Sequence, residues 1–152
     1  NTSNCKSSLI EFATNKNNIH FRNFNVVASD FYDNAIKFGS KDNSLTLLNM
    51  DITSNKSGST AVNLCGTSGN AVSNVKVTSV NIISKGYGLK GNYVSKLMIN
   101  ATNGTSKKYS TQKNSINFTN SSYIKLATSS AKSYVCTSSA NENGVYFSNV
   151  KK

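Results

Sequence analysis

The stretch that decides the fold is Ile19-His20-Phe21-Arg22-Asn23-Phe24-Asn25-Val26. Its apolar residues occupy positions 1, 3, 6 and 8 of this octet, and an asparagine occupies position 5. Alternation of this kind is typical of a strand with one buried face. The step from position 3 to position 6 breaks the alternation by one residue, so the chain must bend there if all four apolar side chains point inward. Such a bend requires a positive φ angle, which asparagine tolerates best after glycine.

The octet recurs along the chain. Five further copies begin at Leu45, Val75, Asn92, Ile116 and Val145, at intervals of 26, 30, 17, 24 and 29 residues. Position 5 is asparagine in four of the six copies and is Ser79 or Lys96 in the other two. A second apolar segment follows several octets, as in Asn34-Ala35-Ile36-Lys37-Phe38-Gly39. One repeat therefore comprises a strand, a bend, a strand, a loop, a strand and a turn, which is typical of a solenoid.

These segments resemble the right-handed parallel β-helix of the pectin-lyase-like superfamily, in which stacked coils place asparagine at one tight turn. The resemblance covers roughly residues 17 to 151. It implies an all-β fold, a single-stranded right-handed parallel β-helix (solenoid) of about six coils. It also implies one asparagine ladder, formed by Asn23, Asn49, Asn120 and Asn149. We expect a single domain over residues 1–152, with a partial first coil or cap at 1–16 and a long loop at 100–114.

The composition of the chain leaves two classes open, a disordered polar chain or a β-rich fold. Its 152 residues include 24 Asn, 25 Ser and 13 Thr and no Pro, and the formal net charge is +11. Hydrophobic residues make up 37% of the chain, with 7 Phe and 7 Tyr, whereas disordered chains are poor in such residues. Apolar runs such as Asn81-Ile82-Ile83 are too short to span a bilayer. The sequence therefore favours an ordered β-rich protein with no membrane span.

A short solenoid leaves its two end coils uncovered, because each coil packs only against its neighbours. Free strand edges at the ends can pair with another chain. Three interpretations stay open: a fragment of a longer solenoid, a subunit that stacks end to end, or a protein whose loops and termini fold over its ends. We expect self-association through the ends of the β-helix.

The superfamily resemblance also implies a candidate enzyme site. In its polysaccharide lyases, aspartates hold Ca²⁺ and a basic residue abstracts a proton, which suits carboxylate ligands and a base beside a uronate. On this reading the Ca²⁺ ligands are Asp30, Asp33 and Asp51, and the candidate bases are Lys37, Lys85 and Lys90. The sequence departs from the enzyme pattern, because it has no paired-aspartate motif and its single arginine lies outside any site motif. Solvated turn carboxylates are the alternative.

Histidine and cysteine restrict the chemistry further. The single histidine, His20, occupies an outward position and has no serine or cysteine motif beside it, so it is expected to be a surface residue. Cys5, Cys65 and Cys136 have neither zinc-site nor C-x-x-C spacing. Free thiols and one disulfide involving Cys5 are both compatible with the sequence.

Surface groups suggest partners. Sixteen of the 17 basic residues are lysines scattered along the chain, which favours solubility and allows attraction to acidic polysaccharide. Nucleic acid is disfavoured, because neither arginine clusters nor a known module is present. Five sequons are candidate glycosylation sites; a sixth, at Asn120, is expected to be used in the bend. The five candidates are Asn1, Asn55, Asn100, Asn103 and Asn117.

The function expected from these features is that of an extracellular structural or adhesive β-helix at a cell or virion surface, which self-stacks into a filament or forms part of a longer fibre. No cofactor is expected for this role. The alternative is a Ca²⁺-dependent polysaccharide lyase, or a carbohydrate-binding or tailspike fragment, acting on acidic polysaccharide. The fold alone does not decide between them.

Overall fold

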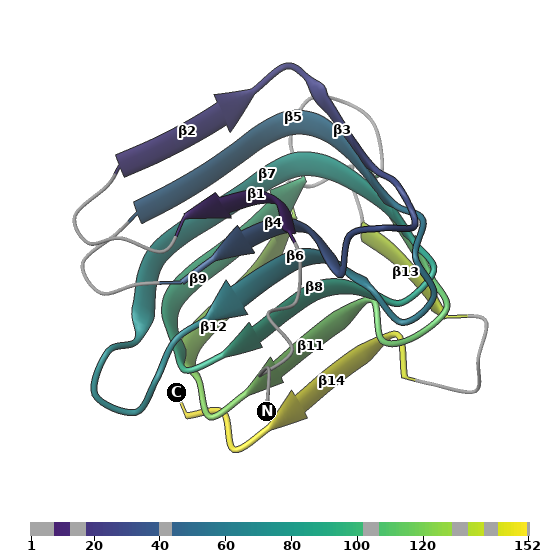
Figure 1. The fold of residues 1–152 in the computed structure, drawn as a ribbon. Coiled ribbons are helices and arrows are strands. Elements are labelled where there is room, and N and C mark those ends of the chain that lie inside the picture. Colours follow the sequence, from purple (N-terminus) through teal and green to yellow (C-terminus); the bar gives the residue numbers. More distant parts are fainter. Residues whose placement is uncertain are drawn as a thin grey trace, which may run out of the picture.

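The computed structural model of the protein describes residues 8–12, 18–39, 44–101, 107–128, 134–138 and 143–151. Within these ranges the chain forms fourteen β-strands, and every pairing between them is parallel. The strands stack rung upon rung in a parallel β-solenoid (Figure 1). The predicted fold class is thus confirmed.

The strands form two sheets. Sheet A consists, in spatial order, of β1 (Ser8–Phe12), β4 (Asn34–Phe38), β6 (Thr60–Cys65), β8 (Tyr87–Asn92), β11 (Ile116–Thr119) and β14 (Val145–Ser148). Sheet B contains β2 (Asn18–Arg22), β3 (Asn25–Ala28), β5 (Ser44–Ser54), β7 (Val72–Ser84), β9 (Val94–Ala101), β10 (Lys107–Thr111), β12 (Ser122–Thr128) and β13 (Tyr134–Ser138).

Sheet B bends into two faces, because β5 and β7 are long strands that continue through a corner. β2 and β3 both pair with β5, and β9 and β10 both pair with β7. We call the half containing β2, β9 and β12 face B1, and the half containing β3, β10 and β13 face B2. Together with sheet A, these two faces enclose the core.

The core is a set of columns that run along the solenoid. On sheet A, equivalent positions in successive rungs carry Ile10, Ile36, Val62, Leu89, Ile116 and Val145. The adjacent column carries Phe12, Phe38, Leu64, Gly91, Phe118 and Phe147. Gly91 has no side chain to pack, and its neighbour Phe118 is fully buried beside it. A Cβ atom added at Gly91 would lie 2.3 Å from Cε1 of Phe118, so the ring takes the space that a side chain would occupy.

The bends predicted at position 5 of the octet are confirmed, since all six residues there have positive φ angles. They are Asn23 (59°), Asn49 (52°), Ser79 (54°), Lys96 (56°), Asn120 (48°) and Asn149 (51°). They do not lie in one column, however. Strand register places Asn23, Asn49 and Ser79 at the corner between faces B1 and B2. Asn120 and Asn149 stack with Tyr93 at the corner between sheet A and face B1, and Lys96 stacks with Asn74 and Tyr123 near the start of face B1.

The predicted asparagine ladder is therefore two ladders. At the corner between faces B1 and B2, Nδ2 of Asn49 donates to Oδ1 of Asn23 at 3.2 Å. At the corner between sheet A and face B1, Asn149 donates to Asn120 at 2.8 Å and Asn120 to Asn92 at 3.0 Å. Strands with alternating inward positions meet at both corners, which is why octets from different corners look alike in the sequence.

The coils differ in length, and the extra residues of the longer coil lie in the connection between β6 and β7. Equivalent positions on sheet B are 26 residues apart from Ile19 to Leu45 and 30 apart from Leu45 to Val75. The longer coil contains a small antiparallel turn in which Thr67 and Asn70 exchange backbone hydrogen bonds of 3.0 and 3.1 Å. Residues 67 to 71 are exposed, so the extra length lies outside the core.

Three expectations need correction or limits. The solenoid has about four turns, slightly fewer than the six coils predicted. Strand β1 is a full rung of sheet A within the segment 1–16, of which the structure describes only residues 8–12. Strand β10 lies within the predicted loop 100–114, so that segment is only partly a loop. Across the described ranges, no helix has the length and apolar character needed to cross a membrane.

Candidate functional site

The candidate bases occupy two places around sheet A. Lys37 and Lys90 lie in one row on its outer surface, in the register Glu11, Lys37, Asn63, Lys90, Asn117. The ammonium of Lys37 forms an ion pair of 2.7 Å with Glu11. The Lys37 ammonium is thus already paired with a carboxylate of this chain. Lys85 lies in the turn between β7 and β8, where its backbone pairs with Ser54 and Gly58.

The candidate Ca²⁺ ligands lie on different elements. Asp30 and Asp33 belong to the turn between β3 and β4, and Asp33 forms an ion pair of 2.8 Å with Lys56. Asp51 is on β5, on the outer surface of face B2. Among the residues that the structure describes, no three His, Cys, Asp or Glu side chains come together as metal ligands could. The structure thus does not bring Asp30, Asp33 and Asp51 into one site.

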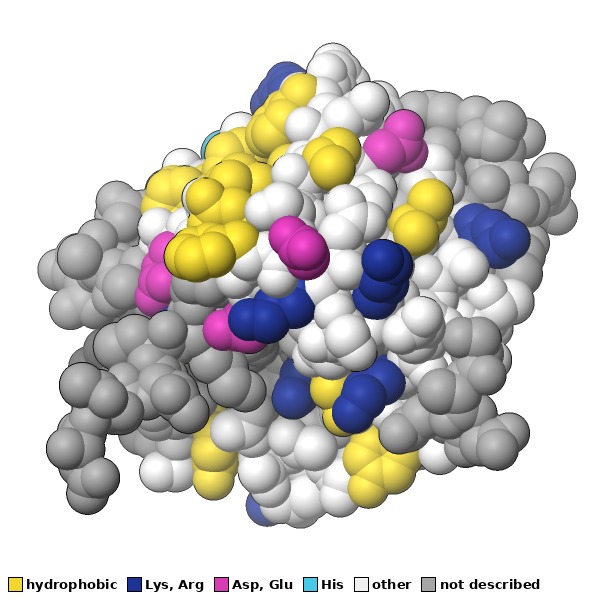
Figure 2. All heavy atoms as spheres, turned by 45° about the vertical axis from the view of Figure 1, so that its right-hand side comes forward, with side chains coloured by type: hydrophobic (Ala, Val, Ile, Leu, Met, Phe, Trp, Pro, Cys, Tyr) yellow, Lys and Arg dark blue, Asp and Glu magenta, His cyan; other side chains and the backbone are white. Residues whose placement is uncertain are grey.

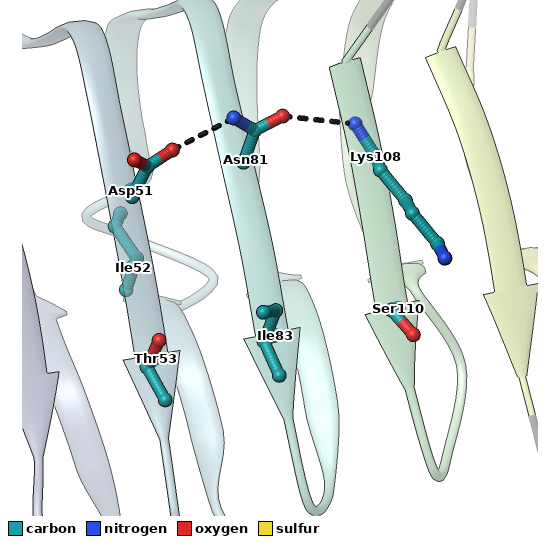
Figure 3. Close-up of a pocket in the computed structure, with 7 residues that line it drawn as sticks. All are labelled: Asp51, Ile52, Thr53, Asn81, Ile83, Lys108 and Ser110. Carbon is teal, nitrogen blue, oxygen red and sulfur yellow. Dashed lines mark hydrogen bonds between the residues drawn. The ribbon is translucent and has the colours of Figure 1, made fainter.

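A shallow depression lies on the outer surface of face B2. Figure 3 shows that neighbouring strands β5, β7 and β10 supply its lining side chains. They are Asp51, Ile52, Thr53, Asn81, Ile83, Lys108 and Ser110. Asn81 connects the three strands, since its Nδ2 donates to Asp51 Oδ1 at 2.7 Å and its Oδ1 accepts from the Lys108 backbone N–H at 3.1 Å (Figure 3).

The depression exposes both polar and apolar groups. It offers hydroxyl groups from Thr53 and Ser110 and an apolar side chain, Ile83, which is 61% exposed. Its lining contains no histidine and no cysteine, so a nucleophile paired with a histidine base is absent from it. Sequence reasoning missed Asn81 and Lys108, because their contact depends on a register between residues 27 positions apart.

The two ends of the solenoid form the other notable surface. Among the described strands, β1, β2 and β3 at one end and β12, β13 and β14 at the other each pair with strands on one side only. At its start β12 is also covered on the outer side, where the Tyr123 N–H donates to the Lys151 carbonyl at 3.1 Å. At the first end, Phe12 lies 5.7 Å from Phe21 and Phe21 lies 5.3 Å from Phe24, measured between ring centroids. Figure 2 shows hydrophobic side chains gathered toward the top of the molecule, where Figure 1 places β2.

Both ends expose large apolar side chains. At the first end these are Leu9, Phe24, Val27 and Phe31, and at the second Tyr123, Leu126, Val145, Tyr146 and Phe147. The three β14 residues are each exposed by about two fifths, although the rings of Phe147 and Phe118 are in contact at 6.3 Å. Val145 and Phe147 thus face the core on one side and are open on the other, whereas Tyr146 lies beside Asn117 in the outward row of sheet A.

The remaining predicted positions are distributed over the surface. His20 is exposed on β2, as its outward position predicted. Asn55 lies in the turn after β5, Asn100 on β9 and Asn117 on β11, each partly buried. Asn1, Asn103 and Cys5 lie outside the described residues. No disulfide joins Cys65 to Cys136, and the disulfide involving Cys5 stays a prediction.

Cys136 gives a prediction about pH. Burial raises the pKa of its thiol above the ordinary value, because desolvation disfavours the thiolate. This contribution to stability is complete below the pKa of the unfolded thiol and is lost as the pH rises through the pKa of the folded one. We expect the alkylation rate of Cys136 by iodoacetamide, followed by peptide mass spectrometry, to rise at a higher pH in the folded protein than in urea. Equal midpoints would contradict the prediction.

Comparison with known proteins adds no relative: no family model, no curated protein and no solved structure matches the chain.

Proposed function

We propose that the protein is a non-enzymatic structural or adhesive β-solenoid that associates end to end with further copies of itself. The observation that carries the proposal is that the apolar columns of the core reach both ends with the same pattern. The inward pair of β14, Val145 and Phe147, occupies the positions that Ile10 and Phe12 occupy on β1. The last strand of sheet A therefore presents the same inward apolar pattern as its first strand.

Stacking would continue the core from one copy into the next. With β14 of one copy beside β1 of another, Val145 would neighbour Ile10 and Phe147 would neighbour Phe12 at the ordinary strand spacing of about 4.8 Å. The free N–H and C=O groups of both edge strands would pair in the same step. Burial of the exposed part of each aromatic side chain favours this contact.

The net charge opposes association. At +11, two copies repel each other, and salt screens this repulsion over a Debye length of about 10 Å at 0.1 M. Association through apolar ends should therefore strengthen as salt is added. Ionic association would weaken instead, so the direction of the salt effect separates the two modes.

Sedimentation velocity over a range of concentrations, in reducing buffer, tests the stacking. Phe147→Asp places a charge on the last rung. It should weaken association by about tenfold or more, since it replaces a phenylalanine that stacking would bury. The matched control is Ile83→Asp, an exposed position in the middle of face B2, which should associate as the parent does. Circular dichroism checks that both variants fold. A parent chain that stays a 16.4 kDa monomer at every concentration and salt would overturn the proposal.

The finer assignments rest on the same features. We propose membership of the pectin-lyase-like superfamily, supported by the parallel solenoid and the asparagine hydrogen bonds at its corners. An extracellular location and use of the sequons at Asn55, Asn100 and Asn117 remain predictions. The lyase reading has less support, because Lys37 is paired with Glu11 and the three aspartates lie apart. The hydroxyl and amide groups on face B2 support carbohydrate binding as a second candidate.

A further inference from the structure

Away from the ends and from face B2, two lysines lie against one aromatic ring. Tyr87 opens β8, in the segment Lys85-Gly86-Tyr87-Gly88-Leu89-Lys90. Nζ of Lys90 lies 4.5 Å from the centroid of the Tyr87 ring, and Nζ of Lys113 lies 5.3 Å from it. Both distances are within the range in which a ring attracts a cation. We call Tyr87, Lys90 and Lys113 the lysine–tyrosine site.

Close backbone packing holds the site together. A Cβ atom at Gly86 would lie 2.0 Å from the carbonyl oxygen of Ser59, and one at Gly88 would lie 2.3 Å from that of Ser115. Adjacent turns can approach the start of β8 only because these two residues are glycines. The Lys113 backbone N–H then donates to the Gly86 carbonyl at 3.0 Å, which places Lys113 one rung beyond Tyr87.

The site lies in a basic part of the surface. Lys85 is exposed in the adjoining turn. Glu11 is engaged by Lys37, and Asp33 by Lys56. On the face drawn in Figure 2, basic side chains gather around a hydrophobic one in the lower half. A ring that attracts two ammonium groups offsets part of the repulsion between them and holds them 4.5 and 5.3 Å from its centroid.

We propose that the lysine–tyrosine site binds a sulfate or phosphate ester group on a polysaccharide. Such a group has three terminal oxygens, and each ammonium has three donors, so an anion beside the ring can accept charge-assisted hydrogen bonds from the lysines. Asn63 and Asn117 flank Lys90 on the neighbouring rungs of sheet A, and their side-chain amides donate to Asn34 and Asn114. Nucleic acid is the less suitable partner, because single strands bind through open aromatic faces and here the ring already holds two cations.

Fluorescence polarisation with labelled dextran sulfate tests the site. The double variant Lys90→Gln, Lys113→Gln should bind at least about tenfold more weakly than the parent, since it removes two charge-assisted contacts. The matched control, Lys76→Gln with Lys125→Gln, removes the same charge from exposed positions on face B1 and should change the dissociation constant by less than about twofold. Equal losses in the two double variants would show general charge attraction and overturn the proposal.

Tyr87 tests whether the ring positions the lysines. Tyr87→Phe keeps the ring and should bind as the parent does, whereas Tyr87→Leu should lose affinity although the charge is unchanged. Equal binding by these two variants, with circular dichroism showing both folded, would contradict the role given to the ring.

Competitors identify the ligand chemistry. Inorganic sulfate and phosphate should displace dextran sulfate from the parent, and uncharged dextran should not. A single-stranded oligonucleotide of thymidine that binds more tightly than dextran sulfate, with the same loss in the Lys90→Gln, Lys113→Gln variant, would assign the site to nucleic acid instead. Binding here should weaken as salt is added, opposite to the association of the ends, so failure of one proposal leaves the other testable.

Discussion

Replacing Phe118 with alanine is expected to lower the free energy of unfolding by about 3–5 kcal/mol, measured by urea denaturation followed by circular dichroism. The ring is fully buried in the second column of sheet A, between Gly91 and Phe147, and its removal leaves a cavity. Val27→Ala is the control, because Val27 is 64% exposed and should change stability by no more than about 0.5 kcal/mol. A loss for Phe118→Ala below about 1 kcal/mol would show that the solenoid repacks around the space.

The contact between Phe118 and Gly91 can be measured separately. Gly91→Ala should cost about 1–3 kcal/mol in the parent, because its new methyl group meets the ring at 2.3 Å. In the Phe118→Ala background the methyl group has room, so its cost should largely disappear. A double-mutant cycle reports the difference as a coupling energy. Additive losses would contradict the packing described for this column.

The second large effect concerns the corner at Asn49. Asn49→Val should lower the free energy of unfolding by about 2–3 kcal/mol, since a β-branched residue is strained at positive φ and the hydrogen bond to Asn23 is lost. Asn49→Gly is the matched variant: it also loses the hydrogen bond but accepts a φ of 52°, so it should cost no more than about 1 kcal/mol. Thermal denaturation ranks the two variants. Equal losses would show that the hydrogen bond, and not the backbone angle, stabilises the corner.

The sequence predicted local geometry better than long-range register. The octet predicted a bend with positive φ, and the structure has one at all six positions, including Ser79 and Lys96. The octet did not predict which corner each bend belongs to, because pairing between rungs depends on residues about one coil apart. Positive φ at Tyr93 and Tyr123 had no signal in the sequence, since tyrosine rarely adopts it.

The candidate sites were predictable only in part. The sequence predicted Lys85 and Lys90 only as candidate bases of a lyase, whereas the contact between Lys113 and Tyr87 joins residues from successive rungs. The same holds for Asn81, whose side chain connects Asp51 and Lys108 across three strands. In a solenoid, residue type indicates which side chains could form a site. The length of each coil decides which residues of the adjacent rungs they contact.

The exposed turn at Thr67 and Asn70 shows that coil length and strand register are independent in this protein. A coil that is four residues longer than the one before it still pairs through β5 and β7 without a break at Leu45 and Val75. Lengthening a surface loop costs little free energy, because the entropy of loop closure grows slowly with length. The connection between β6 and β7 is therefore a place where the chain can gain or exchange residues, and with them new surface chemistry, while the rungs on either side stay aligned.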